Sequence, residues 1–156
     1  AEAKHRSIPD LSIVDVRVFN YFSHRQNTDA RFLITDIVHA IKNKELFKTS
    51  ADNIVRDFIA PPDFYNLIQS IIDFKPINIA LDCYTKHPVS KFYLLDKLKS
   101  EFGLKYKINK SIDIINATGI KLNYYSLSKA ADAIGYIAVN TSIENIIQEI
   151  NLLDIS

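Results

Sequence analysis

Segments with the two-residue period of a β-strand alternate along this chain with segments that have the period of an α-helix. Residues 13–19 carry Val14, Val16 and Val18 on one face, and β-branched residues favour the pleated surface of a strand. Residues 30–43 place their apolar side chains on a single helical stripe. Such alternation predicts an α/β fold.

The remaining elements follow from the same patterns and from capping signals. Thr141 and Glu144 have the spacing of a capping box, in which the N-cap hydroxyl and the third helical residue satisfy each other's backbone N–H groups. Strands or extended segments are predicted over residues 46–49, 54–60, 77–81, 106–115 and 121–125. Further helices are predicted from Pro61-Pro62, from Ser90 to Gly103, up to Gly135 and after Thr141.

Length, charge and glycine content limit the classes of function that this chain can have. The 156 residues suffice for one domain with a core. Lys and Arg are scattered among Asp and Glu with a net charge of +1, which argues against nucleic acid as a partner. No apolar run is long enough to span a bilayer, so no membrane partner is expected. Three glycines cannot supply a phosphate-binding loop of the GxGxxG or GxxxxGKS type.

The numbers and positions of the cysteine and histidine residues limit the possible disulfides, cellular location and metal sites. Cys83 is the only cysteine, so an internal disulfide is excluded and a cytoplasmic location is expected. The four histidines have no partners at metal-ligand spacing, which predicts that there is no zinc site.

Several short motifs occur in the order and spacing of one enzyme family. The segment RVFNYFSHRQ is similar to the family's R-x-x-N-V-Y-G-P-R-Q motif. The segment VRDF, with the aspartate that follows it, is similar to V-R-D-F-x-x-V-x-D. The segment TSIENII is similar to the family's closing helix, T-s-l-E-E-G-i. These stretches, with the SKA and IGY segments that precede the last one, occupy residues 17–26, 55–58, 63, 128–130, 134–136 and 141–147. Together they resemble the extended short-chain dehydrogenases that act on nucleotide sugars, and the likeness covers essentially the whole chain.

The resemblance implies an α/β fold that is the C-terminal substrate-binding portion of a Rossmann-type enzyme and lacks most of the nucleotide-binding half. We expect a single domain over residues 1–156, with residues 1–25 as a remnant of the Rossmann half and residues 26–156 as the nucleotide-sugar-binding region. We also expect residues 14–19 to form an edge strand, through which the chain could self-associate. The implied partners are a nucleotide-sugar substrate and the missing N-terminal Rossmann half, with a homodimer as a further option.

The implied function is that of a substrate-binding fragment of an NAD(P)-dependent nucleotide-sugar epimerase, dehydratase or reductase, serving the synthesis of surface-polysaccharide sugars. NAD or NADP would bind the full-length enzyme, where a catalytic Tyr-Lys pair assists hydride transfer. That pair is not in this chain, so no cofactor binding and no turnover are expected from these residues alone. Two rival functions remain open: a non-catalytic α/β binding or interaction module, and a small α/β hydrolase, although no nucleophile-elbow sequence is present.

Four residues match positions that contact the phosphates in the family. Asn20 follows a predicted strand and would donate to the phosphates, or would be a turn asparagine. Arg56 would bind the diphosphate with its planar fork, or would form a structural ion pair with Asp63. Asn78 would reach the phosphates or bond to backbone, and Asn116 could donate a hydrogen bond without carrying a charge.

Five further residues match positions near the base, the substrate or the cofactor. Phe32, Leu33 and Thr49 correspond to residues that wedge and hydrogen-bond the base, although Leu33 also lies on the core stripe of its helix. Arg31 stands where relatives carry Asn or Lys, and would contact substrate or solvent. Phe19 would approach the nicotinamide of a complete enzyme or pack in the core.

The chain also departs from the family pattern. Ser23 and His24 stand where glycine and proline are usual, and Leu81 replaces a glycine. Asn-Ala-Thr-Gly at residues 116–119 replaces R-P-G-D, which removes a phosphate-binding arginine. These departures indicate a divergent branch.

Overall fold

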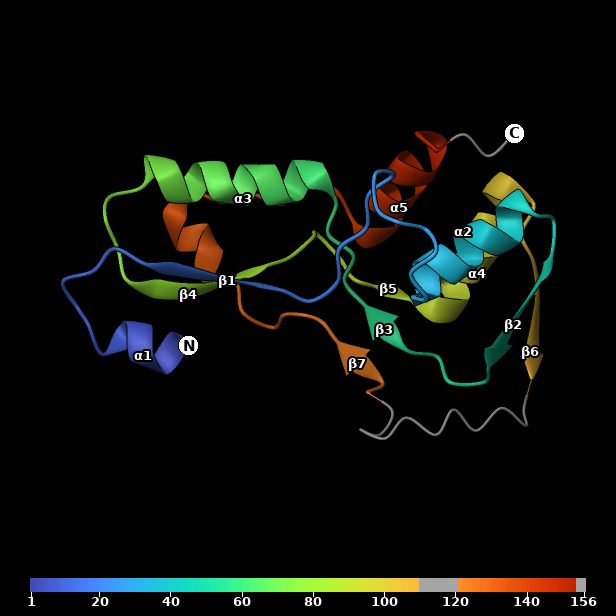
Figure 1. Ribbon diagram of the computed structural model, residues 1–156, viewed down its shortest axis with the longest axis horizontal. Coiled ribbons are helices and arrows are strands. Elements are labelled where there is room, and N and C mark those ends of the chain that lie inside the picture. The colour runs from blue at the N-terminus through green and yellow to red at the C-terminus, as the bar shows by residue number, and fades with distance from the viewer. Residues whose placement is uncertain (110–120, 154–156) are drawn as a thin grey trace.

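The computed structural model describes residues 1–109 and 121–153, in which strands and helices alternate (Figure 1). The α/β class predicted from the sequence is confirmed. The elements are, in order, α1 (Glu2–Arg6), β1 (Val14–Val18), α2 (Leu33–Lys42), β2 (Leu46–Ser50), β3 (Val55–Arg56), α3 (Pro61–Asp73), β4 (Ile79–Cys83), β5 (Val89–Ser90), α4 (Lys91–Phe102), β6 (Lys105–Asn109), β7 (Asn123–Tyr124), the 3-10 helix η1 (Ala130–Ile134) and α5 (Ser142–Asn151).

The strands form three small sheets. β1 pairs in parallel with β4, and β2 pairs in parallel with β6. β3 lies between an antiparallel β5 and a parallel β7. Within the described residues β1 has β4 as its only neighbour, so it is an edge strand, as the sequence predicted.

One group of elements surrounds the β1–β4 sheet at the left of Figure 1. α3 covers one face of the sheet and α1 lies on the other side. The side chains buried here come from α3 and the residues just before it, from β4 and the residue after it, and from the segment around η1. They are Ile59, Leu67, Leu81, Cys83, Tyr84, Ala131, Ile134, Tyr136 and Ala138. α3, β4 and η1 thus pack with β1 in one cluster. The division at residue 25 into a Rossmann remnant and a nucleotide-sugar-binding region stays a prediction.

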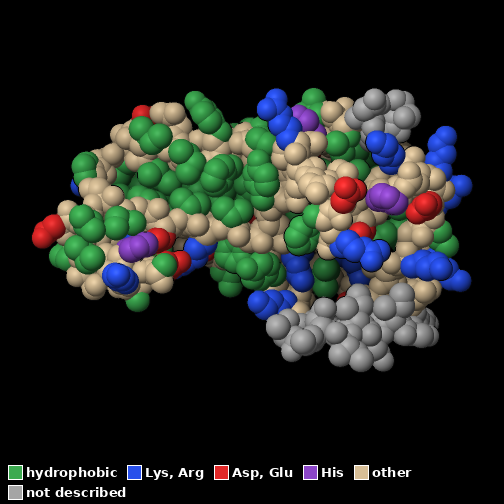
Figure 2. All heavy atoms as spheres, viewed as in Figure 1, with side chains coloured by type: hydrophobic (Ala, Val, Ile, Leu, Met, Phe, Trp, Pro, Cys, Tyr) green, Lys and Arg blue, Asp and Glu red, His purple; other side chains and the backbone are tan. Residues whose placement is uncertain are grey.

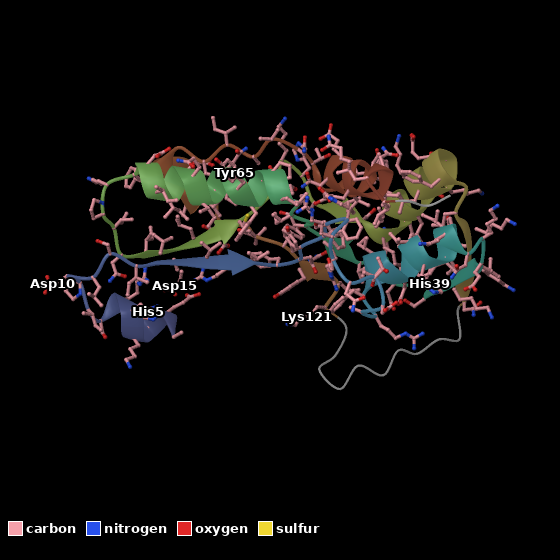
Figure 3. All side chains as sticks on the ribbon, turned by 45° about the horizontal axis from the view of Figure 1, so that its top comes forward. His5, Asp10, Asp15, His39, Tyr65 and Lys121 are labelled. Atoms are coloured by element: carbon pink, nitrogen blue, oxygen red, sulfur yellow. The ribbon has the colours of Figure 1, made fainter. Side chains whose placement is uncertain are left out.

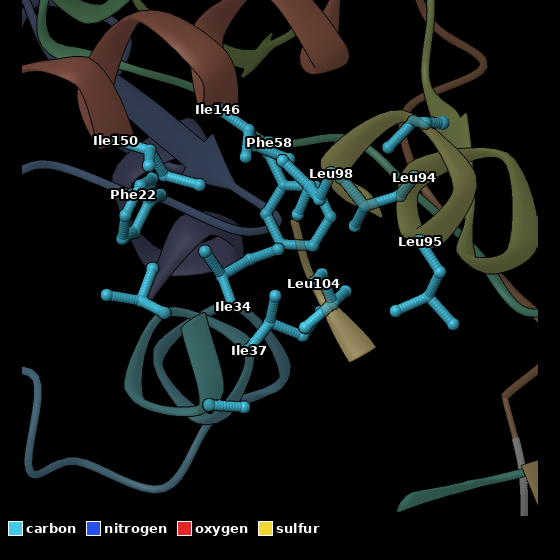
Figure 4. Close-up of a cluster of buried hydrophobic side chains, with 13 residues drawn as sticks. Phe22, Ile34, Ile37, Phe58, Leu94, Leu95, Leu98, Leu104, Ile146 and Ile150 are labelled. Atoms are coloured by element: carbon cyan, nitrogen blue, oxygen red, sulfur yellow. The ribbon is translucent and has the colours of Figure 1, made fainter. Parts of the chain in front are cut away.

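A second cluster lies among α2, α4 and α5 (Figure 4). Phe22 and Phe58 enter it from the segments that follow β1 and β3, and both are nearly inaccessible to solvent. The helices contribute Ile34, Ile37, Leu94, Leu95, Leu98, Ile146 and Ile150. Since Phe22 and Phe58 are anchored in this core, the chain beside them is fixed relative to α2.

The element boundaries differ from the sequence predictions in a few places. The segment predicted as a strand over residues 54–60 forms ladder pairs only in β3 and an isolated bridge between Ile59 and Tyr21. Ser90 occupies the N-cap of α4 without a side-chain capping bond. Of the strand predicted over residues 106–115, the part up to Asn109 is β6 and the rest lies outside the described residues.

Apolar side chains also gather on the surface over α3 (Figure 2). Tyr65 and Ile72 on α3 are 66% and 68% exposed, and Ile137 after η1 is 77% exposed. Self-association of the chain, predicted from the edge strand, stays a prediction. Among residues 1–109 and 121–153, no helix has the length and apolar character needed to cross a bilayer.

Candidate functional site

A cavity of about 400 Å³ opens where the end of β1, the start of α2 and β3 meet. Three segments that are distant in sequence therefore contribute to one site. The lining residues are Phe19, Asn20, Tyr21, Phe22, Gln26, Phe32, Leu33, Ile34, Thr35, Ile54, Arg56 and Phe58. We call this cavity the β1–α2–β3 pocket. Its wall is mainly aromatic and aliphatic with a few polar groups, which is the usual composition of a small-molecule site.

Asn20 fixes the end of β1 against the segment after β3. Its Nδ2 donates to the carbonyl of Asp57 at 3.0 Å, and its own carbonyl accepts from the N–H of Ile59 at 3.0 Å. The N–H of Phe22 donates to the carbonyl of Ile59 at 2.9 Å. Asn20 therefore bonds to backbone as a turn residue would, and it also lines the pocket.

Arg56 lies in β3 and is held by three backbone carbonyls. Nη1 donates to Val55 O at 2.8 Å and to Leu122 O at 3.1 Å, and Nη2 donates to Lys121 O at 2.7 Å. A guanidinium has five N–H donors, so these three bonds leave two, the number that a bidentate contact with a phosphate needs. Burial lowers the pKa of Arg56. No carboxylate of the described residues forms an ion pair with it.

The ion pair between Arg56 and Asp63 that the sequence left open is not formed. Asp63 is fully buried, and its carboxylate accepts instead from the N–H of Val139 at 2.9 Å and from Nδ2 of Asn145 at 2.8 Å. Asp57, beside Arg56, accepts from the N–H and hydroxyl of Thr85 and from the hydroxyl of Ser142. Both carboxylates thus attach the segment from Asp57 to Asp63 to α5, and neither of them lines the pocket.

The first turn of α2 forms the opposite wall. Leu33, Ile34 and Thr35 line the pocket, and the hydroxyl of Thr35 accepts from the N–H of Phe32 at 2.9 Å. The N-terminus of a helix carries a partial positive charge and N–H groups without intrahelical partners, so this wall favours a negatively charged or acceptor-bearing ligand. Phe32 is 62% exposed and forms the rim.

A partly buried pair, His24 and Glu149, holds the loop between β1 and α2. His24 donates to Glu149 Oε2 through its backbone N–H at 2.7 Å, and His24 Nδ1 lies 2.8 Å from the same oxygen. Glu149 is on α5 and is 4% exposed. The histidine that departs from the family pattern therefore anchors this loop to α5.

The structure brings five of the predicted site residues together in the β1–α2–β3 pocket. They are Phe19, Asn20, Phe32, Leu33 and Arg56. Arg31 is exposed and Thr49 is buried in β2, and neither lines the pocket. Asn116 lies outside the described residues.

Asn78 does not line the pocket, and it bonds to backbone, which is one of the two alternatives that the sequence left open. Its Nδ2 donates to the carbonyls of His5 at 2.9 Å and Ile8 at 2.8 Å, so it bonds to the backbone around α1. The parallel register pairs Val14 with Ile79. Asn78 therefore precedes β4 at the end of the sheet opposite to Asn20, which follows β1.

Gln26 is a pocket residue to which the sequence argument gave no role. Its Oε1 is buried and has no hydrogen-bond partner among the described residues. A buried acceptor without a partner is uncommon in a folded protein, and in a ligand pocket it suits a donor on the ligand. Its position in the RVFNYFSHRQ motif could have indicated a role at the site, but nothing in the local sequence pattern showed that it lines the pocket. The described residues contain no group of three or more His, Cys, Asp or Glu that could hold a metal ion.

Comparison with known proteins gives structural neighbours only. No protein-family model matches the sequence, and no curated protein matches it. Three solved structures illustrate the likeness. MoeE5 in complex with UDP-glucose and NAD is 17% identical with a TM-score of 0.73, over 91% of this chain and 47% of that chain. UDP-N-acetylglucosamine 4-epimerase from Bacillus cereus is 13% identical with a TM-score of 0.70, over 92% of this chain and 47% of that chain.

The third is dTDP-glucose 4,6-dehydratase from Bacillus anthracis in complex with NAD, which is 12% identical with a TM-score of 0.74, over 97% of this chain and 47% of that chain. At these identities the likeness is one of fold. The chain has the fold of about half of a Rossmann-type extended short-chain dehydrogenase, consistent with the C-terminal portion that the motifs predicted. It spans about half the length of the solved chains it matches.

Proposed function

We propose that this chain is the nucleotide-sugar-binding portion of an NAD(P)-dependent epimerase, dehydratase or reductase, and that the β1–α2–β3 pocket holds the nucleotide. The observation that carries the proposal is the meeting of Asn20, Phe32 and Arg56, from three separate segments, in one cavity. The fold shared with enzymes solved with UDP-glucose, or named for UDP- and dTDP-sugars, supports it.

The pocket suits the parts of a nucleoside diphosphate. Phe32 and Leu33 offer flat and aliphatic surface for a base, and the N-terminus of α2 offers N–H groups for its oxygens. Arg56 supplies a fixed cation with two donors left for phosphate oxygens. Gln26 supplies a buried acceptor for a donor on the base or sugar.

The chemical step belongs to groups outside this chain. In the complete enzyme NAD or NADP would supply the hydride acceptor, and Phe19, next to Asn20 in the pocket wall, would approach its nicotinamide. This chain's contribution is to bind and orient the sugar nucleotide. The departures at Ser23, His24 and residues 116–119 support a divergent branch, which we assign to surface-polysaccharide sugars.

Arg56 provides the direct test. Isothermal titration of the 156-residue chain with UDP-glucose is the measurement, because UDP-glucose is bound in one of the matching structures. Loss of a charge-assisted contact of roughly 1.5–3 kcal/mol should make Arg56→Ala bind about tenfold to a hundredfold more weakly. Arg56→Lys should recover little, because an ammonium cannot reproduce the fork.

Thermal unfolding of the same variants separates binding from stability, since Arg56 also joins β3 to the chain before β7. A lower melting temperature with unchanged affinity would assign Arg56 to structure alone. If the wild-type chain binds neither UDP-glucose nor dTDP-glucose, the proposed function is wrong, and the non-catalytic interaction module becomes the better hypothesis.

A further inference from the structure

Two cations share one aromatic ring beside the β1–α2–β3 pocket. Nζ of Lys121 lies 5.0 Å from the centroid of the Tyr124 ring, and Cζ of Arg56 lies 6.0 Å from it. Phe19 packs edge-on against the same ring, with centroids 5.1 Å apart. Since Phe19 and Arg56 line the pocket, the Tyr124 ring connects Lys121 to the pocket's border. Figure 3 shows Lys121 near β7, about midway along the long axis and on the lower side of the view.

Backbone bonds fix this arrangement. β3 and β7 pair in parallel, with Arg56 opposite Tyr124. The N–H of Val55 donates to Leu122 O at 2.7 Å, and the Arg56 guanidinium donates to the carbonyls of Leu122 and Lys121. The arginine therefore holds the backbone of the residue that carries the second cation. The Arg56 side chain approaches Tyr124 from β3, and the Lys121 side chain approaches it from the segment just before β7.

The charges of the pair are not neutralised within the described residues. Neither Arg56 nor Lys121 has a carboxylate oxygen within 4.0 Å of its nitrogens there. The face of an aromatic ring attracts a cation only weakly at an exposed site, by about 0.5–1 kcal/mol. Two cations near one ring also repel each other. An anion between them would remove that repulsion and gain attraction from both.

We propose that Lys121 and Arg56 form one anion subsite at the mouth of the pocket, and that Lys121 is the second cation for the diphosphate of the ligand. Tyr124 is the positioning residue that holds the lysine within reach of that subsite. The proposal rests on the proposed function and assigns a ligand contact to Lys121, which no motif of the sequence indicated. The ligand class is a nucleoside diphosphate, with the charge contributed by its phosphates.

The experiment compares UDP with uridine, which share the base and differ in charge. Lys121→Ala should weaken UDP binding by about fivefold and leave uridine binding unchanged, because an exposed charge contributes about 1 kcal/mol. The dependence of UDP affinity on salt should also decrease. Tyr124→Leu, which removes the ring, should weaken UDP binding in the same direction, and Tyr124→Phe should not.

Lys97 offers a matched control, because its Nζ lies 5.9 Å from the Tyr93 ring on α4, away from the pocket. Lys97→Ala removes an equivalent contact and should leave UDP affinity and its salt dependence unchanged. An unchanged UDP affinity in Lys121→Ala, with clear binding by the wild type, would overturn this assignment and leave the proposed function standing. An equal loss for uridine would overturn it as well, since the lysine would then not act on the phosphates. A wild-type chain that binds no UDP at all would overturn both.

Discussion

Asp57 and Asp63 carry buried carboxylates that accept hydrogen bonds from uncharged donors. They are 2% and 0% exposed, and no Lys, Arg or His of the described residues lies within ion-pair distance of either. A buried carboxylate is costly unless hydrogen bonds compensate for lost water. Asp57 receives bonds from Thr85 and Ser142, and Ser142 begins α5, where the helix dipole favours a negative charge. These bonds attach β3 to α5.

Asp57→Asn should therefore destabilise the chain without affecting its ligand. The amide keeps one oxygen and turns an N–H toward a donor, so at least one hydroxyl or N–H loses its partner at a cost of about 1–3 kcal/mol. Urea unfolding should show a loss of about 2 kcal/mol in the free energy of unfolding. UDP affinity should stay unchanged, because Asp57 does not line the pocket.

Asp10→Asn is the control for this change, because Asp10 is exposed in the turn after α1 (Figure 3). It should alter neither quantity. A variant of Asp57 with normal stability and weakened binding would show that this carboxylate contacts the ligand.

At the scale of the elements, α5 holds the site through residues along its whole length. Thr141 and Glu144 form the predicted capping box, with the Thr141 hydroxyl accepting from Glu144 N at 3.3 Å and Glu144 Oε2 accepting from Thr141 N at 2.7 Å. Behind this cap, Asn145 donates to Phe58 O at 3.0 Å and to Asp63, and Glu149 anchors the His24 loop. A correctly started α5 thus positions both sides of the pocket.

The cap makes stability depend on pH in a defined direction. The hydrogen bond from the Thr141 N–H lowers the pKa of Glu144 from its ordinary value of 4.5. Because the folded pKa lies below the unfolded one, the stabilising contribution is present above pH 4.5 and is lost as the pH falls through the folded pKa. Glu144→Ala should therefore be less stable than the wild type at pH 7, with a difference that shrinks at pH 3.

Urea unfolding at the two pH values measures this difference. Glu101→Ala is a suitable control, since Glu101 is exposed near the end of α4 and its carboxylate makes no hydrogen bond to a described residue. A wild-type advantage over Glu144→Ala that is equally large at both pH values would contradict the assignment of the cap.

At the scale of the whole molecule, the two hydrophobic clusters meet along the segment from Phe58 to Ile59. Phe58 belongs to the cluster among α2, α4 and α5, and Ile59 belongs to the cluster on the β1–β4 sheet. Cys83 is at the end of β4, fully buried in the second cluster, and burial raises the pKa of its thiol to about 12. Its reactivity therefore reports on the opening of the β1–β4 sheet.

Cys83 should react slowly with iodoacetamide at pH 8 while the chain is folded. Only the thiolate is nucleophilic, and both the raised pKa and the lack of exposure suppress its reaction. We expect a labelling rate roughly a thousandfold or more below that of the chain in 8 M urea, because a stable domain opens rarely. Mass spectrometry follows the single adduct, and Cys83→Ser gives the background. Labelling as fast as in urea would mean that the sheet around β4 does not stay closed.

The local sequence by itself determined the secondary-structure elements and the fold class of this protein. Three kinds of feature depend only on residues within one or two turns, and each can therefore be predicted from the adjacent sequence. They are the helical and strand periods, the Thr141–Glu144 cap, and the left-handed helix ends at Gly103 and Gly135. The α/β class followed from their alternation, and five of the proposed site residues were identified through motif resemblance.

Only the tertiary structure decided which of these residues meet. The parallel register of β1 and β4 puts Asn78 at the far end of the sheet from Asn20, and Arg56 finds its carbonyl partners at Lys121 and Leu122, about 65 positions along the chain. The buried acceptor of Gln26 and the ring shared by Arg56 and Lys121 exist only once distant strands pair. Such contacts depend on packing between segments far apart in sequence, and no local pattern records which partner each side chain will reach.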